Sequence, residues 1–273
     1  MKIEKHKLEG APYKLAAHFG SVRDRSLGLY IIAHDTAGAS LESTVDYITG
    51  EPTAPVSYHA VIGRDGSVTQ MVPFDRVAYH AGLSEHPRKP WLKSLNRCSI
   101  GLAFDNPGTL SHVAGGYKSW FGKSYAHSDV VAGTRKNRTR YYLPYTREQI
   151  DTFIAIVEAL NSEYVVSEVL SHYDVAPSRK DDTSPLFDPV IEGLNHRLED
   201  KSDDVEFGIR AIVGVAGGLN LRRGPGLEHD VIEVLHFGAG VNILSEQKPT
   251  GYVFVNTDDG NSGWVHAHYL EGR

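Results

Sequence analysis

The sequence is poor in cysteine, which limits both its covalent and its metal chemistry. Cys98 is the one cysteine among 273 residues. A lone thiol cannot form an internal disulfide, so no disulfide framework supports the fold. Zinc sites built entirely from thiolates are excluded as well, and a bound metal would need histidine, aspartate or glutamate ligands. The chain has 14 histidines, enough to justify a search for clusters among them.

Long apolar runs are also missing. No stretch approaches the roughly 18 consecutive apolar residues of a membrane-spanning helix, so no membrane span is expected. Residues 1–7 are mostly charged and no apolar run follows them, which predicts that the chain carries no N-terminal secretory signal. We therefore expect a protein that works in the cytoplasm, that is exported or released by another route, or whose signal has been removed.

An excess of positive charge is absent too. The net charge of −6 argues against a general nucleic-acid binder, because such proteins usually carry a basic excess. An apolar content of 41%, a charged content of 23% and a mean hydropathy of −0.30 are ordinary for a globular protein. The length allows one large domain or two modest ones, each with its own core. The oligomeric state stays open.

A charged segment marks the clearest domain boundary. Residues 199–206 (EDKSDDVE) lack aromatic side chains and separate two different sequence patterns, as expected of a solvated linker. We predict a first domain over residues 1–200, a linker over 201–206 and a second domain over 207–273.

Strands and helices are expected to mix in the first domain. The apolar run that ends at His34 is typical of a buried strand, and Asp65-Gly66 is a hairpin turn signal. Thr146 and Gln149 are suited to a capping box at the start of a helix. The mixture predicts an α/β domain with a mixed β-sheet. Strands are expected at 29–33, 56–62, 67–72 and 99–104, and helices at 41–50, 146–160 and 189–198.

The second domain shows short apolar stretches separated by glycine, proline and aspartate turns. This pattern predicts a small all-β barrel of about 65 residues. Its strands are expected at 209–215, 219–226, 231–235, 241–244, 252–256 and 263–265.

One segment gathers residues that are able to bind a metal. His172, Lys180 and Asp182 lie within eleven residues, and Pro177 prevents the segment from forming one regular helix. The chain could fold back here and direct His172 and Asp182 at one point. Zinc in a hydrolase needs three protein ligands, and His34 could be the third. The residues alone leave the ordinary alternatives open, namely a solvated loop and a histidine that packs in the core.

Five sequence blocks then support a family resemblance. The blocks are IIAHDTAG at 31–38, VSYH at 56–59 with Asp65-Gly66, AYHAG at 78–82 with Ser84, SIGL at 99–102, and 172–182 with PLFD at 185–188. In these blocks and their order, over residues 29–189, the chain resembles the zinc-dependent N-acetylmuramoyl-L-alanine amidases of the amidase-2 type, a family that includes phage amidases and peptidoglycan recognition proteins. The resemblance implies a mixed central sheet flanked by helices.

The resemblance implies a zinc site and a reaction. His34, His172 and Asp182 would bind Zn²⁺, and the substrate would be the amide bond between N-acetylmuramic acid and L-alanine in peptidoglycan. Zinc lowers the pKa of a bound water molecule to around 7 and polarises a carbonyl, which suits amide hydrolysis at neutral pH. Lys180 occupies the position of the lysine that stabilises the transition state in this family, where a cation neutralises the developing oxyanion.

The chain departs from the family at Ala103, where many members have a glutamate that is their proposed general base. Alanine has no proton acceptor and cannot do this. Three explanations compete: some phage amidases rely instead on a tyrosine at the position of Tyr58, the chain is an inactivated variant, or it is a natural binder that kept the zinc. The neighbouring Asp105-Asn106 resembles members that have the glutamate, which favours the inactivated variant.

Two further histidines and an insertion are candidates for substrate contact. His59 and His80 match positions that line the cleft in relatives, although a structural role is an equal alternative. Residues 108–143 look like an insertion, and within 117–140 it has six basic residues against Asp129 alone, with aromatic residues between them. Such a loop could bind the carboxylates of stem peptides. The alternative is a solvated loop whose aromatic side chains pack on the domain.

The second domain resembles a bacterial SH3-like domain, on the residues LNLRRGP at 219–225 and GWVHAHYL at 263–270. Such domains often hold cell-wall peptides, which would keep an attached hydrolase near its polymer. Trp264 would be either a core residue or a platform for the ligand. Rival functions are a non-catalytic muropeptide-binding protein and a zinc peptidase that cuts within the stem peptide. Phage lysis, recycling, division and attack on competitors all remain open as roles.

Overall fold

The computed structural model describes residues 1–50, 53, 55–199, 209–243 and 250–272. The contacts within it divide the chain into two compact units, residues 1–108 with 148–183 and residues 109–147 with 184–273. The predicted linker at 201–206 lies outside the described residues. The predicted bounds of the two domains therefore stay a prediction.

A five-stranded mixed sheet forms the centre of the first unit, in the order β14-β3-β8-β4-β5. β14, β3, β8 and β4 run parallel to one another, and β5 pairs with β4 as an antiparallel hairpin. Every residue of this sheet is buried, which explains the apolar character of β4 and of most of β3 and β8. The predicted α/β class with a mixed sheet is confirmed. The strands are β3 (Tyr30–Asp35), β4 (Ala60–Ile62), β5 (Val68–Gln70), β8 (Ser99–Phe104) and β14 (Glu168–Ser171).

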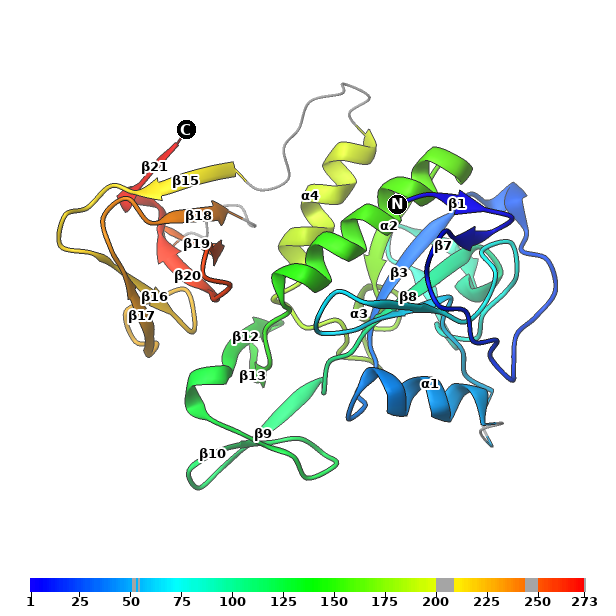
Figure 1. Ribbon diagram of the computed structural model, residues 1–273, viewed down its shortest axis with the longest axis horizontal. Helices are drawn as coiled ribbons and strands as arrows, with labels where there is room; N and C mark the ends of the chain where they lie inside the picture. The colour runs from blue at the N-terminus through cyan, green and yellow to red at the C-terminus, as the bar shows by residue number, and fades with distance from the viewer. Residues whose placement is uncertain (51–52, 54, 200–208, 244–249, 273) are drawn as a thin grey trace. The chain divides into compact units, whose positions relative to one another are not determined.

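The helices α1 (Leu41–Thr49) and α2 (Arg147–Tyr164) lie on opposite sides of this sheet (Figure 1). Alternation along β8 directs Ala103 towards the apolar cluster that includes α1, while the ring of Phe104 contacts Phe153 of α2, with centroids 5.2 Å apart. Both helices were predicted from the spacing of their apolar residues. No described helix has both the length and the apolar character needed to cross a bilayer.

Gln149 ties the first turn of α2 to the edge of the sheet. Its side-chain amide donates hydrogen bonds to the carbonyls of Ile62 and Asp105, and its oxygen accepts one from Arg64. The side chain is buried, so these bonds satisfy polar atoms that water cannot reach. The capping box with Thr146 stays a prediction. The shorter elements of this unit are β1 (Ile3–Glu4), β2 (Lys7–Leu8), β6 (Glu85–His86), β7 (Lys89–Lys93) and α3 (His172–Val175).

The insertion is a sheet, and the expectation of a loop was wrong. Its five antiparallel strands have the order β11-β10-β9-β13-β12. Lys136 and Asn137 both have positive φ, as the two-residue turn between β12 and β13 requires. Tyr117 is buried against Tyr141, with ring centroids 4.8 Å apart, whereas Trp120 is 77% exposed. The strands are β9 (Thr109–Val113), β10 (Gly116–Lys118), β11 (Ser124–Tyr125), β12 (Val131–Arg135) and β13 (Arg138–Tyr142), and α4 (Asp188–Glu199) belongs to the same unit.

The C-terminal segment forms a seven-stranded antiparallel sheet in the order β17-β16-β20-β19-β18-β15-β21, around a small apolar core. Six strands were predicted, and the seventh, β21, is short and was missed. Trp264 is 7% exposed and its ring lies 5.3 Å from that of Phe254. Both alternate with Val253 and Val265 of this core, so they are buried on the other face of the sheet. The strands are β15 (Ile209–Val213), β16 (Leu219–Arg222), β17 (Val231–Leu235), β18 (Gly240–Ile243), β19 (Tyr252–Thr257), β20 (Ser262–His266) and β21 (Leu270–Gly272).

The burial of Trp264 predicts the effect of its removal. Trp264→Ala is expected to lower the free energy of unfolding of the barrel by about 3–5 kcal/mol, because it leaves a large cavity. Trp91→Ala is the control, since Trp91 is 77% exposed and its loss should change stability by about 0.5 kcal/mol or less. Calorimetric unfolding of the full chain measures both. Equal small effects would contradict the burial of Trp264.

Candidate metal centre

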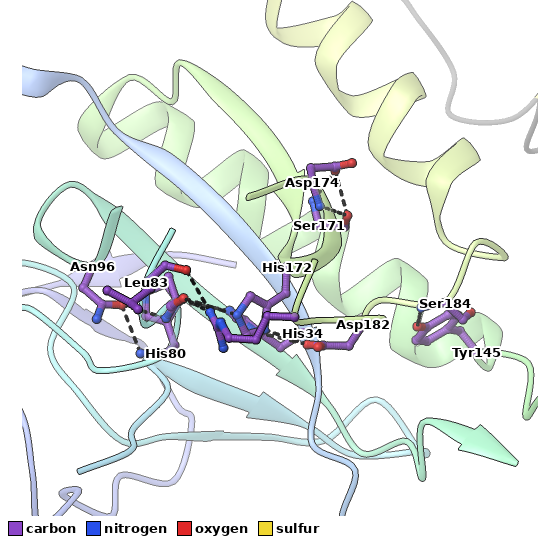
Figure 2. A network of polar contacts seen from close by, with 12 residues as sticks. His34, His80, Leu83, Asn96, Tyr145, Ser171, His172, Asp174, Asp182 and Ser184 are labelled. Atoms are coloured by element: carbon purple, nitrogen blue, oxygen red, sulfur yellow. Dashed lines mark hydrogen bonds and ion pairs between the residues drawn. The ribbon is translucent and has the colours of Figure 1, made fainter. Parts of the chain in front are cut away.

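Two neighbouring parallel strands bring His34 and His172 together. Ala33 of β3 is paired with Ser171 of β14, so the next residue on each strand lies at the same carboxyl end of the sheet. Ligand sites of open α/β sheets gather at this end. Ser171 caps α3 through a hydrogen bond from the backbone of Asp174, and this turn begins at His172. Figure 2 shows the two imidazoles side by side, 138 positions apart in the sequence.

Asp182 returns to the same place through the loop that follows α3. The backbone N–H of Tyr173 donates to the carbonyl of Asp182, which closes the loop on itself. Arg179 donates to the carbonyls of Ala81 and Leu83 and holds the loop against that segment. The predicted folding back of residues 172–182 is therefore observed.

Three potential ligand atoms face one another. His34 Nδ1 lies 3.0 Å from His172 Nδ1 and 3.4 Å from Asp182 Oδ2, and the distance between the latter two is 3.0 Å. Ligands about 2.0–2.1 Å from a tetrahedral zinc ion are separated by about 3.3 Å. Two imidazole nitrogens and one carboxylate oxygen are also a donor set that zinc accepts. The residues fit a zinc ion, and no other group of this kind occurs among the described residues.

The environment keeps these groups in the protonation states that metal binding requires. Burial, followed by the proximity of His172, lowers the pKa of His34 to about 4. Burial opposes ionisation of Asp182, but the adjacent imidazoles of His172 and His34 outweigh it and hold the pKa of this carboxyl below its ordinary value. At neutral pH the site therefore offers a neutral imidazole beside a carboxylate, and metal ligands must be deprotonated in this way.

Lys180 and Tyr58 lie close to the three ligand residues. The charge of Lys180 contributes to the lowered pKa of His34, which places the ammonium group within electrostatic range of that ring. The ring of Tyr58 lies 5.2 Å from that of His34. Burial, then the charges of Asp182 and Asp35, raise the pKa of the Tyr58 hydroxyl well above its ordinary value. In the metal-free site Tyr58 thus stays protonated at neutral pH, and its hydroxyl can donate a hydrogen bond.

Ala103 lies beside His34 on the adjacent strand. The two residues are paired in the register of β3 and β8, and Ala103 has no solvent exposure. Its surroundings are the apolar cluster that includes Val61 and Val45, with the partly buried Tyr58 packed against it. Ala103 is thus adjacent to the ligand set and supplies no proton acceptor to it.

His59 and His80 have different surroundings. His59 has no solvent exposure; its Nδ1 accepts from the Gly101 N–H, and its Nε2 lies 3.0 Å from the Arg76 carbonyl. These bonds favour the structural alternative for His59. His80 lies directly against the ligand set, with its Nδ1 3.0 Å from His34 Nε2. Substrate contact by either residue stays a prediction.

Sequence reasoning did not identify the residues that surround His80. The Oδ1 of Asn96 accepts from the backbone N–H groups of His80 and Ala81, and Ser99 Oγ lies 3.2 Å from His80 Nε2. His80, Ala81 and Ser99 all lie within the sequence blocks that carry the family resemblance. Those blocks were the available signal, although the contacts between them are not visible in the sequence.

Two segments of the chain match the sequence profiles of known families. Residues 25–185 match the sequence profile of the N-acetylmuramoyl-L-alanine amidase family. The chain belongs to this family. Residues 217–271 match the profile of the bacterial SH3 domain.

Individual relatives are similar over the amidase region. The 1,6-anhydro-N-acetylmuramyl-L-alanine amidase AmpD of Citrobacter freundii is 28% identical over 144 residues, 52% of this chain and 58% of its own length. AmpD of Escherichia coli K12 is 30% identical over 135 residues, 49% of this chain and 54% of its own length. The chain spans about half the length of these curated relatives. A crystal structure of a selenomethionine AmpD derivative covers 72% of this chain and 99% of its own, with 23% identity and a TM-score of 0.47.

The buried histidines predict how the stability of the metal-free protein depends on pH. Burial lowers the pKa of His34 to about 4 and that of His59 to about 3, from 6.5. The unfolded chain therefore binds more protons than the folded chain below pH 6.5. The free energy of unfolding should be highest above this pH. It should decrease towards pH 4 by up to about 1.4 kcal/mol per pH unit for each histidine.

Urea unfolding in the presence of a chelator, between about pH 7.5 and about pH 5, measures this decrease. His59→Gln is the control, because it lacks one of the buried titrating groups and should flatten the profile. A stability that is unchanged over this range would contradict the buried, neutral state of both imidazoles.

Proposed function

We propose that the chain has the architecture of a zinc-dependent N-acetylmuramoyl-L-alanine amidase. Its substrate bond is the amide between N-acetylmuramic acid and L-alanine of peptidoglycan. The observation that carries the proposal is the convergence of His34, His172 and Asp182, with ligand atoms 3.0–3.4 Å apart, in the part of the chain that matches this family. The names of the relatives support the choice of substrate.

Each residue of the site has a distinct task in this proposal. A bound zinc ion would supply Lewis acidity at the scissile carbonyl and would make water acidic enough to attack at neutral pH. The Lys180 ammonium group stabilises the negative charge that develops on the carbonyl oxygen. The Tyr58 hydroxyl, protonated because its pKa is raised, donates a hydrogen bond to the reacting group. Burial of His34 and His172 keeps the ligand geometry rigid.

Proton transfer is the step that this chain performs poorly. A well-placed general base contributes about 10²–10⁴-fold to a hydrolytic rate. Ala103 occupies the position of the family's glutamate and has no proton acceptor. Tyr58 is a poorer proton acceptor than the glutamate, because its pKa in the metal-free site is raised and the hydroxyl stays protonated. We therefore interpret the chain as an amidase site whose binding apparatus is intact and whose proton acceptor is missing, as in an inactivated variant.

The C-terminal barrel extends the proposal to the polymer. A domain of the bacterial SH3 type that binds the cell wall would raise the effective concentration of substrate at the attached site. Intact wall is therefore the substrate we favour over soluble fragments. A wall substrate implies that the protein acts after export or release from the cytoplasm.

A non-catalytic muropeptide-binding protein is the second candidate function. Ala103 is the observation that favours it, because a site with all three ligands and no base can bind without cutting. A zinc peptidase acting within the stem peptide is separated from both by its products. Mass analysis of a digest shows intact stem peptides with a free L-alanine amine only if the bond to N-acetylmuramic acid is cut.

The ligand set predicts the metal content. The purified chain is expected to hold about one zinc ion after dialysis, and His172→Ala is expected to lose it, because two protein ligands do not retain zinc. His236→Ala is the control, since His236 is exposed on the barrel. Metal analysis by mass spectrometry measures all three proteins. Zinc that persists in His172→Ala would show that the ligand assignment is wrong.

Restoring the carboxylate tests the missing base. Ala103→Glu is expected to raise the rate of turbidity loss of purified peptidoglycan by about 10²–10⁴-fold. Ala103→Gln is the matched control, because it has the same size and cannot accept a proton in the same way. If Ala103→Glu binds zinc and shows no gain, Tyr58-dependent chemistry or pure binding replaces the disabled-enzyme interpretation. Tyr58→Phe then separates these two through the residual activity of the parent chain.

A further inference from the structure

We infer that His80 is a positioning residue that fixes the tautomer of His34, so that the lone pair of His34 Nδ1 faces the metal centre. The inference rests on the proposed zinc function. It comes from a buried chain of polar contacts that runs from His34 to the backbone of Leu95 (Figure 2 shows the contact between His34 and His80). His34 Nε2 lies 3.0 Å from His80 Nδ1, His80 Nε2 lies 3.2 Å from Ser99 Oγ, and Ser99 Oγ lies 2.7 Å from the Leu95 carbonyl oxygen.

The direction of every hydrogen bond in this series of contacts follows from the last one, between Ser99 and Leu95. A carbonyl oxygen only accepts, so the single proton of the Ser99 hydroxyl is donated to Leu95. Ser99 Oγ must then accept from His80, which places the proton of the neutral His80 ring on Nε2. His80 Nδ1 is left as an acceptor, and His34 donates to it from Nε2. His34 Nδ1 consequently carries no proton. The tautomers are assigned from this network.

The surroundings of His80 are buried and closely packed. His34 and Ser99 have no solvent exposure, and His80 is 6% exposed, so water does not replace a missing partner easily. Gly101 lies directly beneath the His80 ring, where an added Cβ would come within 2.4 Å of its Cγ. The glycine of the SIGL block therefore makes the space in which the ring lies.

The backbone next to His80 orients the second histidine ligand. His172 Nε2 lies 3.4 Å from the carbonyl oxygen of Ala81, so its other nitrogen, Nδ1, faces Asp182. Asn96 Oδ1 accepts from the N–H groups of both His80 and Ala81, at 3.1 Å and 2.7 Å, and holds this dipeptide in place. Residues 80–81 thus provide the outer acceptor for both imidazoles.

This arrangement has a definite consequence for metal binding. Outer partners of metal-bound histidines set the tautomer and the ring orientation, and their loss typically costs 10–100-fold in metal affinity. Here the partner of His34 is the neutral imidazole of His80, and the contact with Ser99 decides which of its nitrogens donates and which accepts. Without it, the buried His34 Nε2–H loses its acceptor. The alternative tautomer, with its proton on Nδ1, then becomes populated and must give up that proton before a metal binds.

Three variants of the full chain test the inference. His80→Ala removes the acceptor, whereas His80→Asn restores one, because the Asn Oδ1 is the same number of bonds from the backbone as the His Nδ1. His86→Ala is the matched control: His86 is equally buried and is hydrogen-bonded at both nitrogens, to Glu168 and to the Arg88 N–H, but contacts no ligand residue through these bonds. Thermal unfolding confirms that each variant is folded.

Two measurements distinguish positioning from general stabilisation. The first is the zinc affinity, measured by competition with a chromophoric chelator. His80→Ala is expected to bind zinc about 10–100-fold more weakly than the parent, with His80→Asn recovering most of the loss and His86→Ala within about twofold. The second is the ¹⁵N spectrum of the histidine rings in the metal-free protein. It should show the His34 proton on Nε2 in the parent and in His80→Asn, and on Nδ1 to a measurable extent in His80→Ala.

The outcomes separate this inference from the proposed function. A parent that binds no zinc overturns the proposed zinc function, and the inference falls with it. A parent that binds zinc while His80→Ala binds it equally tightly overturns the inference alone. Equal weakening of zinc binding in His80→Ala and His80→Asn also overturns it. The loss of affinity would then come from removing the imidazole ring and not from removing the hydrogen-bond acceptor of His34. An unchanged His34 tautomer in metal-free His80→Ala also overturns the inference.

Discussion

The parallel pairing of β3 with β14 and β8 is the constraint on which the site depends. It sets His34 level with Ala103 on one side and, through Ala33 and Ser171, brings it next to His172 on the other. Because the side chains of a strand alternate between the two faces, a slip of one residue in β3 would turn His34 away from both partners. The complete burial of these strands specifies the register strongly, since the same slip would disrupt the packing against α1 and α2.

A second constraint follows from placing so many imidazoles in a core. A buried polar group without a partner is costly, so each ring nitrogen needs a defined donor or acceptor. His59 meets this requirement through the backbone, whereas His80 meets it through His34 and Ser99. The same requirement that makes these histidines tolerable in the core also decides which nitrogen of His34 is left for a metal. Stability and metal binding are thus linked at His80.

The binding apparatus and the proton acceptor of this site are separable. The three ligand atoms, Lys180 and Tyr58 are gathered by strand ends and by one loop, and none of them requires a carboxylate at position 103. Ala103 packs into an apolar cluster beside them without disturbing that arrangement. An amidase fold can therefore retain its ligand geometry when its base is absent, which is why metal content and hydrolysis have to be measured separately in this chain.

The sequence by itself determined the mixed α/β class, the hairpin, the helices α1, α2 and α4, and most strands of the barrel, because these depend on local periodicity and turn chemistry. The residues alone made His34 a possible third ligand beside the segment 172–182 but left ordinary alternatives open, and the family resemblance turned this possibility into an expectation. The tertiary structure decided what depends on partners outside the local segment: that β13 pairs with β9 to join two hairpins into one sheet, that Trp264 is buried, and that His59 and His80 differ. Strand pairing across intervening segments, side-chain packing and contacts between buried side chains set these outcomes, and local propensity does not encode them.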